Sequence, residues 1–282
     1  MDAPSPPTAR RIWLCADDYG IAPGVNGAIR DLVAKGRLNA TSAMMVASSM
    51  TRAEASALTI LTAGDPRVGV GLHVTLTGRF KPLSAGYQPT RDGHFPNVGP
   101  LLMATLHGRL DRAMLSREIE AQFAAFRRLF GRAPDFVDGH QHVQVFPQVR
   151  DAVLAATQAH APQAWVRQCG AITPFARRLG DPKGLLIGWL SRTFQAQATR
   201  LGIATNPAFA GTYTYRATTD FARIFPGFLD GLPDGSLVMC HPGVVDAELE
   251  RVDPLTTLRE AEYAYFGGPD FPRALAAKGV TL

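Results

Sequence analysis

Short apolar runs alternate with longer amphipathic stretches along most of this chain. The apolar runs are typical of buried strands and cover residues 11–16, 40–47, 68–76, 136–143, 164–168, 209–215, 236–240 and 280–282. Apolar positions at helical spacing predict helices over residues 23–35, 51–62, 114–130, 147–159, 183–201, 221–231, 258–265 and 271–278. This alternation predicts an α/β fold of parallel strands joined by crossover helices. By itself it leaves a barrel and an open doubly wound sheet equally open.

Two segments fall outside the alternation. Residues 1–10 are Pro-rich and polar without an apolar centre, which predicts a disordered tail rather than a secretory signal. Residues 78–100 are rich in Gly, Pro and polar side chains and predict a long loop. Long loops in compact domains are usually functional or mobile, so we expect this one to cover a cleft. Residues 11–282 form a single predicted domain, because no linker or change of composition divides them.

Charge, hydropathy and cysteine content narrow the class of protein. The formal net charge is +5, but the Lys and Arg residues are scattered, so we expect no nucleic-acid binding. No uncharged apolar run reaches about 18 residues, so we expect no membrane span. Three cysteines without paired spacing argue against disulfides and favour a reducing, cytoplasmic compartment. The oligomeric state stays open, and a homodimer is compatible with the sequence.

Acids and histidines stand in or directly after several of the apolar runs. Asp17 and Asp18 follow the first run, and two adjacent carboxylates repel each other unless a cation or a proton lies between them. His73 lies inside the run GVGLHVTL, where a core histidine and a metal ligand are both plausible. His241 ends the run LVMC. In parallel α/β folds the carboxyl ends of strands converge on the active site, so these segments taken together favour a functional site more than any one of them does alone.

The segment FVDGHQHVQV is the most specific signal. Asp138, His140, His142 and Gln144 alternate with other residues, so a strand here would place all four on one face. Polar groups on a buried face need partners, which favours a site over packed core. A His-x-His pair on a strand is a common way to present imidazoles to a metal.

The combined set of acids and histidines, with no paired cysteines, fits a catalytic metal with nitrogen and oxygen ligands and an open position. A serine hydrolase is less well supported, because the chain has no G-x-S-x-G sequence. The chain also has no phosphate-binding loop and no dinucleotide fingerprint. The residues therefore point to metal-assisted chemistry.

Five segments of the chain together resemble a known protein family. The segments ADDYGIAPGVNGAI, TSAMMV, GLHVTLT with the following Pro82-Leu83, PDFVDGHQHVQVFPQV and VMCHPG occur in this order. Together they resemble the YdjC-like carbohydrate deacetylase family over roughly residues 11–282. Arg259, Glu262 and the closing KGVTL also resemble the end of that family. The resemblance implies a distorted (β/α) barrel of TIM-barrel type and hydrolysis of the acetamide of an N-acetylated amino sugar.

The resemblance also implies one divalent metal ion, Mg²⁺ or Zn²⁺, held by Asp18, His73 and His140. Two positions depart from the family pattern. Gln144 stands where the family usually continues with a histidine, and Phe136 stands where a histidine often precedes the aspartate. Neither removes an implied ligand. We expect both to line the substrate cleft, so they leave the identity of the sugar open.

Roles for the remaining polar residues follow from this chemistry. Asp17 is the candidate general base for water, and His241 is the candidate general acid for the departing amine. His142 is the competing acid, and we expect His142 and Asp138 to support the metal ligands or to contact substrate. Arg167, at the end of its predicted strand, is expected either to hold the sugar or to lie on the surface.

Two alternative functions remain. Another metal-dependent amidohydrolase or a phosphoesterase would assemble more ligands, often for two metals. A non-catalytic sugar-binding protein would need aromatic stacking surfaces but no pair equivalent to Asp17 and His241.

Overall fold

Seven parallel strands form the centre of the protein. The computed structural model describes residues 9–88, 90–170 and 182–282. Its main sheet has the order β6-β5-β4-β3-β2-β8-β7. These strands are β2 (Trp13–Tyr19), β3 (Ala40–Ala43), β4 (Gly69–Val74), β5 (Phe136–Gly139), β6 (Trp165–Val166), β7 (Phe209–Ala210) and β8 (Leu237–Cys240). All pairings within it are parallel, as the strand and helix alternation predicted.

The sheet curls so that its two edges approach each other. The main-chain N–H of Val166 in β6 donates to the carbonyl of Ala204 at 2.9 Å, and that of Leu237 in β8 donates to Ala208 at 3.0 Å. Residues 204–210 therefore contain one edge strand, β7, and also bond to the opposite edge strand, β6. This closure confirms a distorted (β/α) barrel and settles the choice against an open doubly wound sheet, which the sequence pattern could not make.

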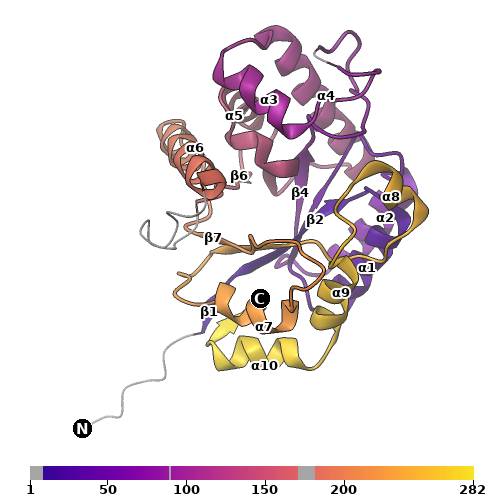
Figure 1. Cartoon of the computed structure of the whole chain (residues 1–282), viewed down its shortest axis with the longest axis vertical. Coiled ribbons are helices and arrows are strands. Elements are labelled where there is room, and N and C mark those ends of the chain that lie inside the picture. Colours follow the sequence, from indigo (N-terminus) through magenta and orange to yellow (C-terminus); the bar gives the residue numbers. More distant parts are fainter. Residues whose placement is uncertain (1–8, 89, 171–181) are drawn as a thin grey trace.

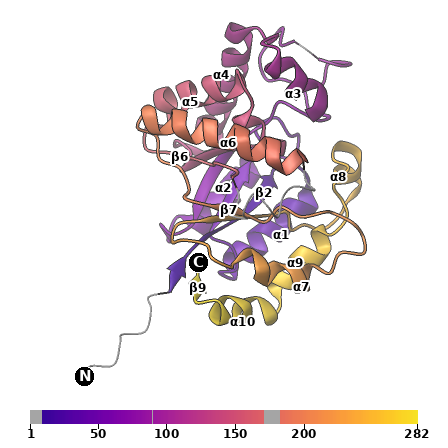
Figure 2. The same ribbon diagram turned by 60° about the vertical axis from the view of Figure 1, so that its left-hand side comes forward.

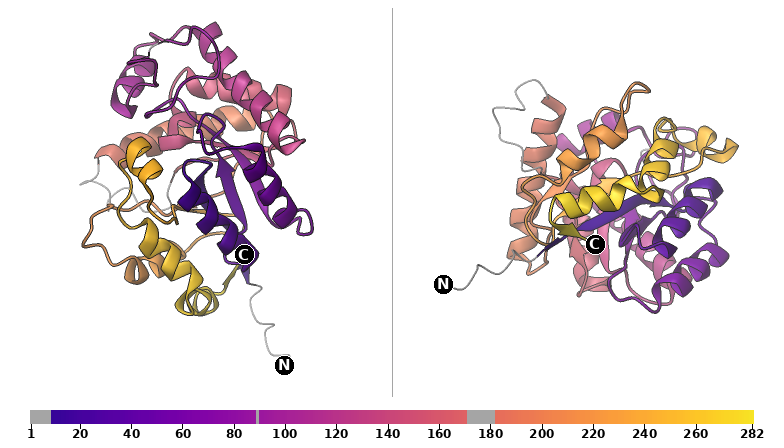
Figure 3. Two further views of the ribbon diagram at one scale, coloured as in Figure 1. Left: turned by 90° about the vertical axis from the view of Figure 1, so that its right-hand side faces the viewer. Right: turned by 90° about the horizontal axis from the view of Figure 1, so that it is seen from below.

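Helices surround the barrel (Figures 1 and 2). The predicted ones are present as α1 (Pro23–Ala34), α2 (Arg52–Thr62), α4 (Arg112–Phe130), α5 (Val149–His160), α6 (Pro182–Arg200), α7 (Phe221–Phe228), α9 (Arg259–Gly267) and α10 (Asp270–Ala277). Seen from below, α10 lies beneath the barrel near the C-terminus (Figure 3). The structure adds two short helices that the sequence pattern did not predict, α3 (Val98–Leu106) and α8 (Ala247–Val252).

Local signals explain where the long helix α4 starts and stops. The Asp111 side chain accepts a hydrogen bond from the N–H of Met114 at 2.8 Å and caps the first turn. Gly131 ends the helix in the left-handed conformation, with φ of 71°. Between these caps Ile119 and Phe123 are fully buried on the face that packs against the barrel.

The predicted strand over residues 136–143 is wrong in its second half. β5 ends at Gly139, which is the last residue paired with β4, and a 3₁₀ helix, η1 (His140–Val145), follows at once. Gln141 and His142 have φ of 54° and 61°, so the chain turns sharply there. The strand stops because its neighbour stops pairing. His140, His142 and Gln144 therefore do not share one strand face.

Other boundaries also differ from the predictions. The strand expected over residues 209–215 is only two residues long as β7. Of the expected tail, residues 1–10, positions 1–8 lie outside the described residues. Its last residue, Arg10, already pairs with Val280 in a second small sheet of β1 (Arg10–Arg11) and β9 (Val280–Thr281).

The two ends of the barrel differ in character. Near the amino ends of the strands the Phe136 and Trp165 rings stack with centroids 4.6 Å apart, and Trp13 adjoins Trp165 at 5.9 Å. A side chain at Gly71 would collide with the Phe136 ring. The polar side chains gather toward the carboxyl ends. No helix among the described residues is long and apolar enough to cross a membrane.

Candidate metal centre

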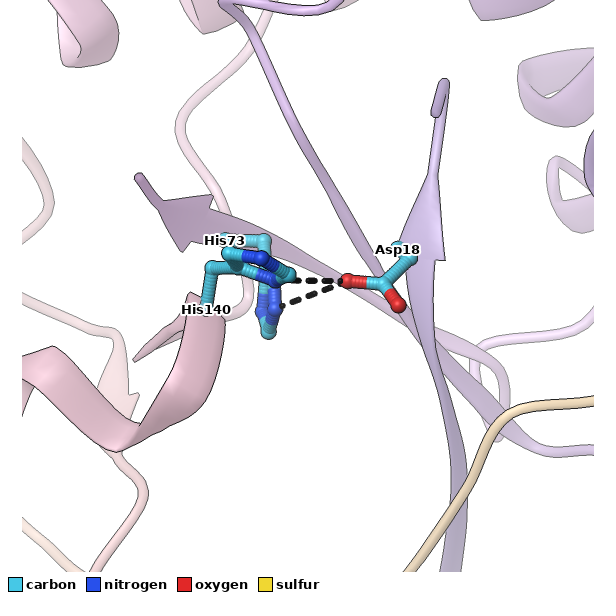
Figure 4. A group of neighbouring side chains, drawn as sticks. All are labelled: Asp18, His73 and His140. Carbon is cyan, nitrogen blue, oxygen red and sulfur yellow. Dashed lines mark hydrogen bonds and ion pairs between the residues drawn. The ribbon is translucent and has the colours of Figure 1, made fainter. Parts of the chain in front are cut away.

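Three side chains from three parts of the barrel converge on one point (Figure 4). Asp18 comes from β2, His73 from β4, and His140 is the first residue after β5. The Asp18 Oδ1 atom lies 3.0 Å from His140 Nδ1 and 3.4 Å from His73 Nε2. All three residues are buried, and one ligand atom from each lies within 4.8 Å of the others. The structure thus brings together the three ligands that the resemblance implied.

An irregularity in β2 allows neighbouring acids to serve the same site. The register between β2 and β3 shifts between Ala16 and Tyr19, and Asp18 has φ of 67°. Adjacent strand residues normally point to opposite faces. Here Asp17 and Asp18 are both buried, at 2% and 1% exposure, and both bond to side chains at the carboxyl end of the barrel.

Hydrogen bonds fix the orientation of His73. Its Nδ1 lies 2.6 Å from Asp138 Oδ1 and 2.9 Å from the Ser42 hydroxyl, so Nε2 is the nitrogen that faces Asp18. Burial alone would lower the pKa of His73, but the Asp138 carboxylate outweighs it and raises the pKa to about 10. A carboxylate behind a metal-binding imidazole sets its orientation and increases its basicity. Asp138 therefore supports the candidate ligand His73 from a buried position.

Asp17 is paired with a guanidinium. Arg167 Nη1 donates to Asp17 Oδ2 at 2.7 Å, and Nη2 donates to Oδ1 at 2.6 Å. Burial alone would raise the pKa of Asp17, but Arg167 lowers it to about 2. Arg167 also pairs with Asp138 and donates to Cys15 Sγ at 3.0 Å. Arg167 is fully buried, which excludes the surface position that the sequence left open.

A second group of potential ligands consists of Cys15, Asp17 and Asp138. The Arg167 guanidinium contacts all three side chains and already supplies a positive charge between the carboxylates. Burial raises the pKa of Cys15 well above its usual value, which keeps the thiol protonated. This second group therefore does not fit a metal ion, whereas the group around Asp18 does.

The second oxygen of Asp18 is held from helix α9. Arg259 Nη2 donates to Asp18 Oδ2 at 2.7 Å and lies 3.1 Å from Asp253 Oδ2. Arg259 and Asp253 are both buried. The guanidinium leaves Oδ1 of Asp18 as the oxygen that faces the two histidines. Sequence reasoning placed Arg259 in the family resemblance but gave it no role.

His241 lies at the carboxyl end of β8 and is half-buried. Its Nδ1 is 3.1 Å from the Tyr215 hydroxyl, and its main-chain N–H donates to Glu262 Oε2 at 2.5 Å. Burial of the ring lowers the pKa of His241 below its usual value. Neither Tyr215 nor Glu262 was assigned a role from the sequence. The spacing of Arg259 and Glu262, one helical turn apart, is the signal that could have indicated a shared function.

The remaining predicted site residues lie beside this centre. His142 is half-buried, its Nδ1 lies 3.5 Å from Cys169 Sγ, and its ring meets Phe209 edge-on. Gln144 is buried and donates to the Arg167 carbonyl at 3.2 Å, while Phe136 packs at the opposite end of the barrel. Phe136 therefore does not line the cleft, contrary to the expectation from its sequence position.

The donor chemistry of the Asp18 group fits a divalent cation. One carboxylate and two imidazoles supply mixed oxygen and nitrogen ligands, which is typical of catalytic sites that leave a position for water. The ligands are buried, and Asp138 and Arg259 support them from behind. A divalent cation held by these residues would polarise a carbonyl oxygen and lower the pKa of a water molecule.

A family model and relatives of known name match nearly the whole chain. Residues 11–277 match the family model of YdjC-like proteins. The chain is 36% identical over 271 residues to the chitooligosaccharide deacetylase of Yersinia pestis bv. Antiqua (strain Angola), covering 95% of this chain and 94% of the relative. It is 35% identical over the same length to the chitooligosaccharide deacetylase of Yersinia pseudotuberculosis serotype O:3 (strain YPIII).

Solved structures support the fold. A proposed cellobiose-phosphate cleavage protein from Enterococcus faecalis V583 superposes with a TM-score of 0.74 at 17% identity, covering 98% of this chain and 97% of that one. The Bc1960 peptidoglycan N-acetylglucosamine deacetylase superposes with a TM-score of 0.51 at 9% identity, covering 97% and 87%. Since the family model and the curated relatives span nearly the whole chain, this protein belongs to the YdjC-like family.

Proposed function

We propose that this protein is a metal-dependent hydrolase that removes the acetyl group from an N-acetylated amino sugar. The convergence of Asp18, His73 and His140 carries the proposal. The relatives named chitooligosaccharide deacetylase, at about 36% identity over 95% of the chain, suggest a chitooligosaccharide as the first substrate to test. Both alternatives considered from the sequence, a different metallohydrolase and a sugar-binding protein, are addressed by the experiment below.

Asp18, His73 and His140 would hold one divalent cation, Mg²⁺ or Zn²⁺. When bound, such an ion polarises a carbonyl oxygen and lowers the pKa of a water molecule. Two imidazoles and one carboxylate suit Zn²⁺ and related transition metals, whereas Mg²⁺ favours oxygen ligands. Asp138 and Ser42 hold the His73 ring so that Nε2 faces the centre, and Arg259 holds Asp18 so that Oδ1 does.

Asp17 acts as the general base in this proposal. The Arg167 guanidinium holds both of its oxygens, which fixes the carboxylate beside the metal ligand Asp18. The carboxylate then accepts a proton from the attacking water. Because Arg167 is fully buried and bound to Asp17 and Asp138, it positions the base in our proposal rather than the sugar.

His241 donates the proton that the departing nitrogen needs. An amine is a poor leaving group until it is protonated, so an acid is required on the side away from the base. His241 comes from β8, the neighbour of β2 on the side away from β3 and β4. Its Nδ1 is engaged by Tyr215, which leaves Nε2 for the substrate. His142 is the competing candidate for the general acid, and the variants His241→Ala and His142→Ala distinguish the two.

The decisive test is acetate release from a panel of N-acetylated sugars, including acetylated chitobiose. Metal-free protein is compared with protein given Mg²⁺, Zn²⁺, Mn²⁺ or Co²⁺. Acetate release that requires a metal supports the proposal. A protein that binds the sugars but releases no acetate with any metal is a sugar-binding protein. Two bound metal ions per chain, with turnover of phosphoesters or other amides only, would indicate the other metallohydrolases.

A further inference from the structure

The candidate acid His241 is held at two separate points. β8 ends at Cys240, so the main-chain N–H of His241 has lost its place in the sheet and needs another acceptor. That acceptor is Glu262 Oε2, at 2.5 Å. The imidazole ring is held independently, because Nδ1 lies 3.1 Å from the Tyr215 hydroxyl. One contact fixes the backbone and the other fixes the ring.

Tyr215 is itself supported by its surroundings. Its ring packs against Tyr213 with centroids 4.2 Å apart and meets the His241 ring edge-on at an interplanar angle of 80°. A phenol oxygen is a neutral partner that accepts from an imidazole N–H without adding a charge. When one ring nitrogen of a histidine is engaged, the other is the one left to exchange protons with a ligand.

Glu262 connects the acid to the metal ligands. Its carboxylate is buried, with one oxygen on His241 and the other accepting from the Tyr213 hydroxyl. Arg259, one turn earlier on α9, holds the Asp18 carboxylate. Residues three apart lie on the same helix face. One turn of α9 therefore sets the positions of Asp18 and His241 relative to each other.

We propose that Tyr215 and Glu262 are positioning residues that hold His241 by its ring and by its main chain, so that Nδ1–H donates to Tyr215 and Nε2 exchanges protons. This inference rests on the proposed function. As the C–N bond of the substrate breaks, its electron pair goes to nitrogen, and that nitrogen takes the Nε2 proton of the protonated ring. The other proton stays on Nδ1, still hydrogen-bonded to the Tyr215 hydroxyl. Nε2 then regains a proton from solvent.

The first experiment measures the protonation of His241 directly. Nitrogen NMR on the full chain labelled at its 7 histidines, with His241→Gln to assign the signal, reports which ring nitrogen carries the proton. We expect neutral His241 in the wild type to carry it on Nδ1, and Tyr215→Phe to move it to Nε2. A wild-type signal showing the proton on Nε2, or no change in Tyr215→Phe, overturns the inference. This readout is independent of any deacetylase activity.

The second experiment separates positioning from folding. Tyr215→Phe should lower kcat about tenfold, part of the roughly 10²–10⁴ that a general acid contributes, with KM nearly unchanged. Glu262→Gln keeps an oxygen for the His241 N–H and should retain most activity, whereas Glu262→Ala should not. Tyr263→Phe is the matched control, because the Tyr263 hydroxyl bonds to Asp31 on α1. If the wild type releases acetate and Tyr215→Phe and Glu262→Ala both keep the kcat of the wild type, the positioning role is refuted and the proposed function still stands.

Discussion

Arg167 donates to both carboxylate oxygens of Asp17, at 2.7 and 2.6 Å, although 150 positions separate the two residues in the chain. Both side chains are buried, so removal of Arg167 leaves the Asp17 carboxylate as an uncompensated buried charge. The same guanidinium contacts Asp138, which orients the His73 ring. Arg167 thus connects the candidate base to one of the candidate metal ligands.

Breaking this pair should therefore cost stability as well as activity. We expect Arg167→Met to lower the free energy of unfolding by about 3–5 kcal/mol, because it leaves buried carboxylates without a partner. The double variant Arg167→Met with Asp17→Asn should recover part of that loss, since one of those charges is then gone. Urea unfolding of the wild type, both single variants and the double variant measures this coupling. Simple additivity of the two single effects would contradict it.

Adjacent acids should separate cleanly into base and ligand. Asp17→Asn should lower kcat by about 10²–10⁴ while bound metal stays near the wild-type level, because Asp17 is held by Arg167. Asp18→Asn should lose the metal, since Asp18 is one of three converging candidate ligands. Metal content per chain and kcat are measured on the same samples. Equal metal loss in both variants would remove the distinction.

The identity of the general acid is decided by two histidine variants. His241→Ala should lower kcat by about 10²–10⁴ without loss of metal. His142→Ala should have the smaller effect, because His142 packs against Cys169 and Phe209 beside the centre. Full kcat in His241→Ala together with a large loss in His142→Ala would transfer the role to His142.

The loop predicted over residues 78–100, of which the last three belong to α3, is expected to shape the sugar subsites, and Glu118 on α4 anchors it. The Glu118 carboxylate is fully buried and accepts from the N–H of Leu83 at 3.1 Å and of Ser84 at 2.7 Å. Phe80 in the same loop meets the His140 ring edge-on at 6.2 Å. We expect Glu118→Ala to raise KM several-fold with a smaller change in kcat. An unchanged KM across sugars of different length would argue against a substrate role for this loop.

Glu262 should impose a pH dependence on stability. Burial raises its pKa from 4.5 to about 7, so the folded state favours the protonated carboxyl. The associated stability is complete below the unfolded pKa near 4.5 and is lost as the pH rises through about 7. Relative to Glu262→Gln, the wild type should lose on the order of 3 kcal/mol between pH 4.5 and 7.5. Unfolding at several pH values measures this difference, with Glu120→Gln, an exposed carboxyl on α4, as the control.

The sequence alone determined the local elements and the chemical types at the site. Apolar periodicity gave the order of strands and helices, because side-chain burial follows the local period of each element. The acids and histidines at the ends of apolar runs indicated a site because polar groups need partners when buried. The family resemblance correctly identified Asp18, His73 and His140 as residues that converge.

The tertiary structure decided what depends on contacts between distant segments. His140, His142 and Gln144 do not share one strand face, because β5 stops at Gly139, the last residue that pairs with β4. Closure of the barrel depends on the segment that leads into the edge strand β7, because that segment also bonds to the opposite edge strand β6. Arg167 pairs with Asp17, which lies 150 positions away in the chain, and Arg259 pairs with Asp18, which lies 241 positions away. The local spacing of apolar residues cannot predict such long-range pairs, because the two partners come together only in the folded barrel.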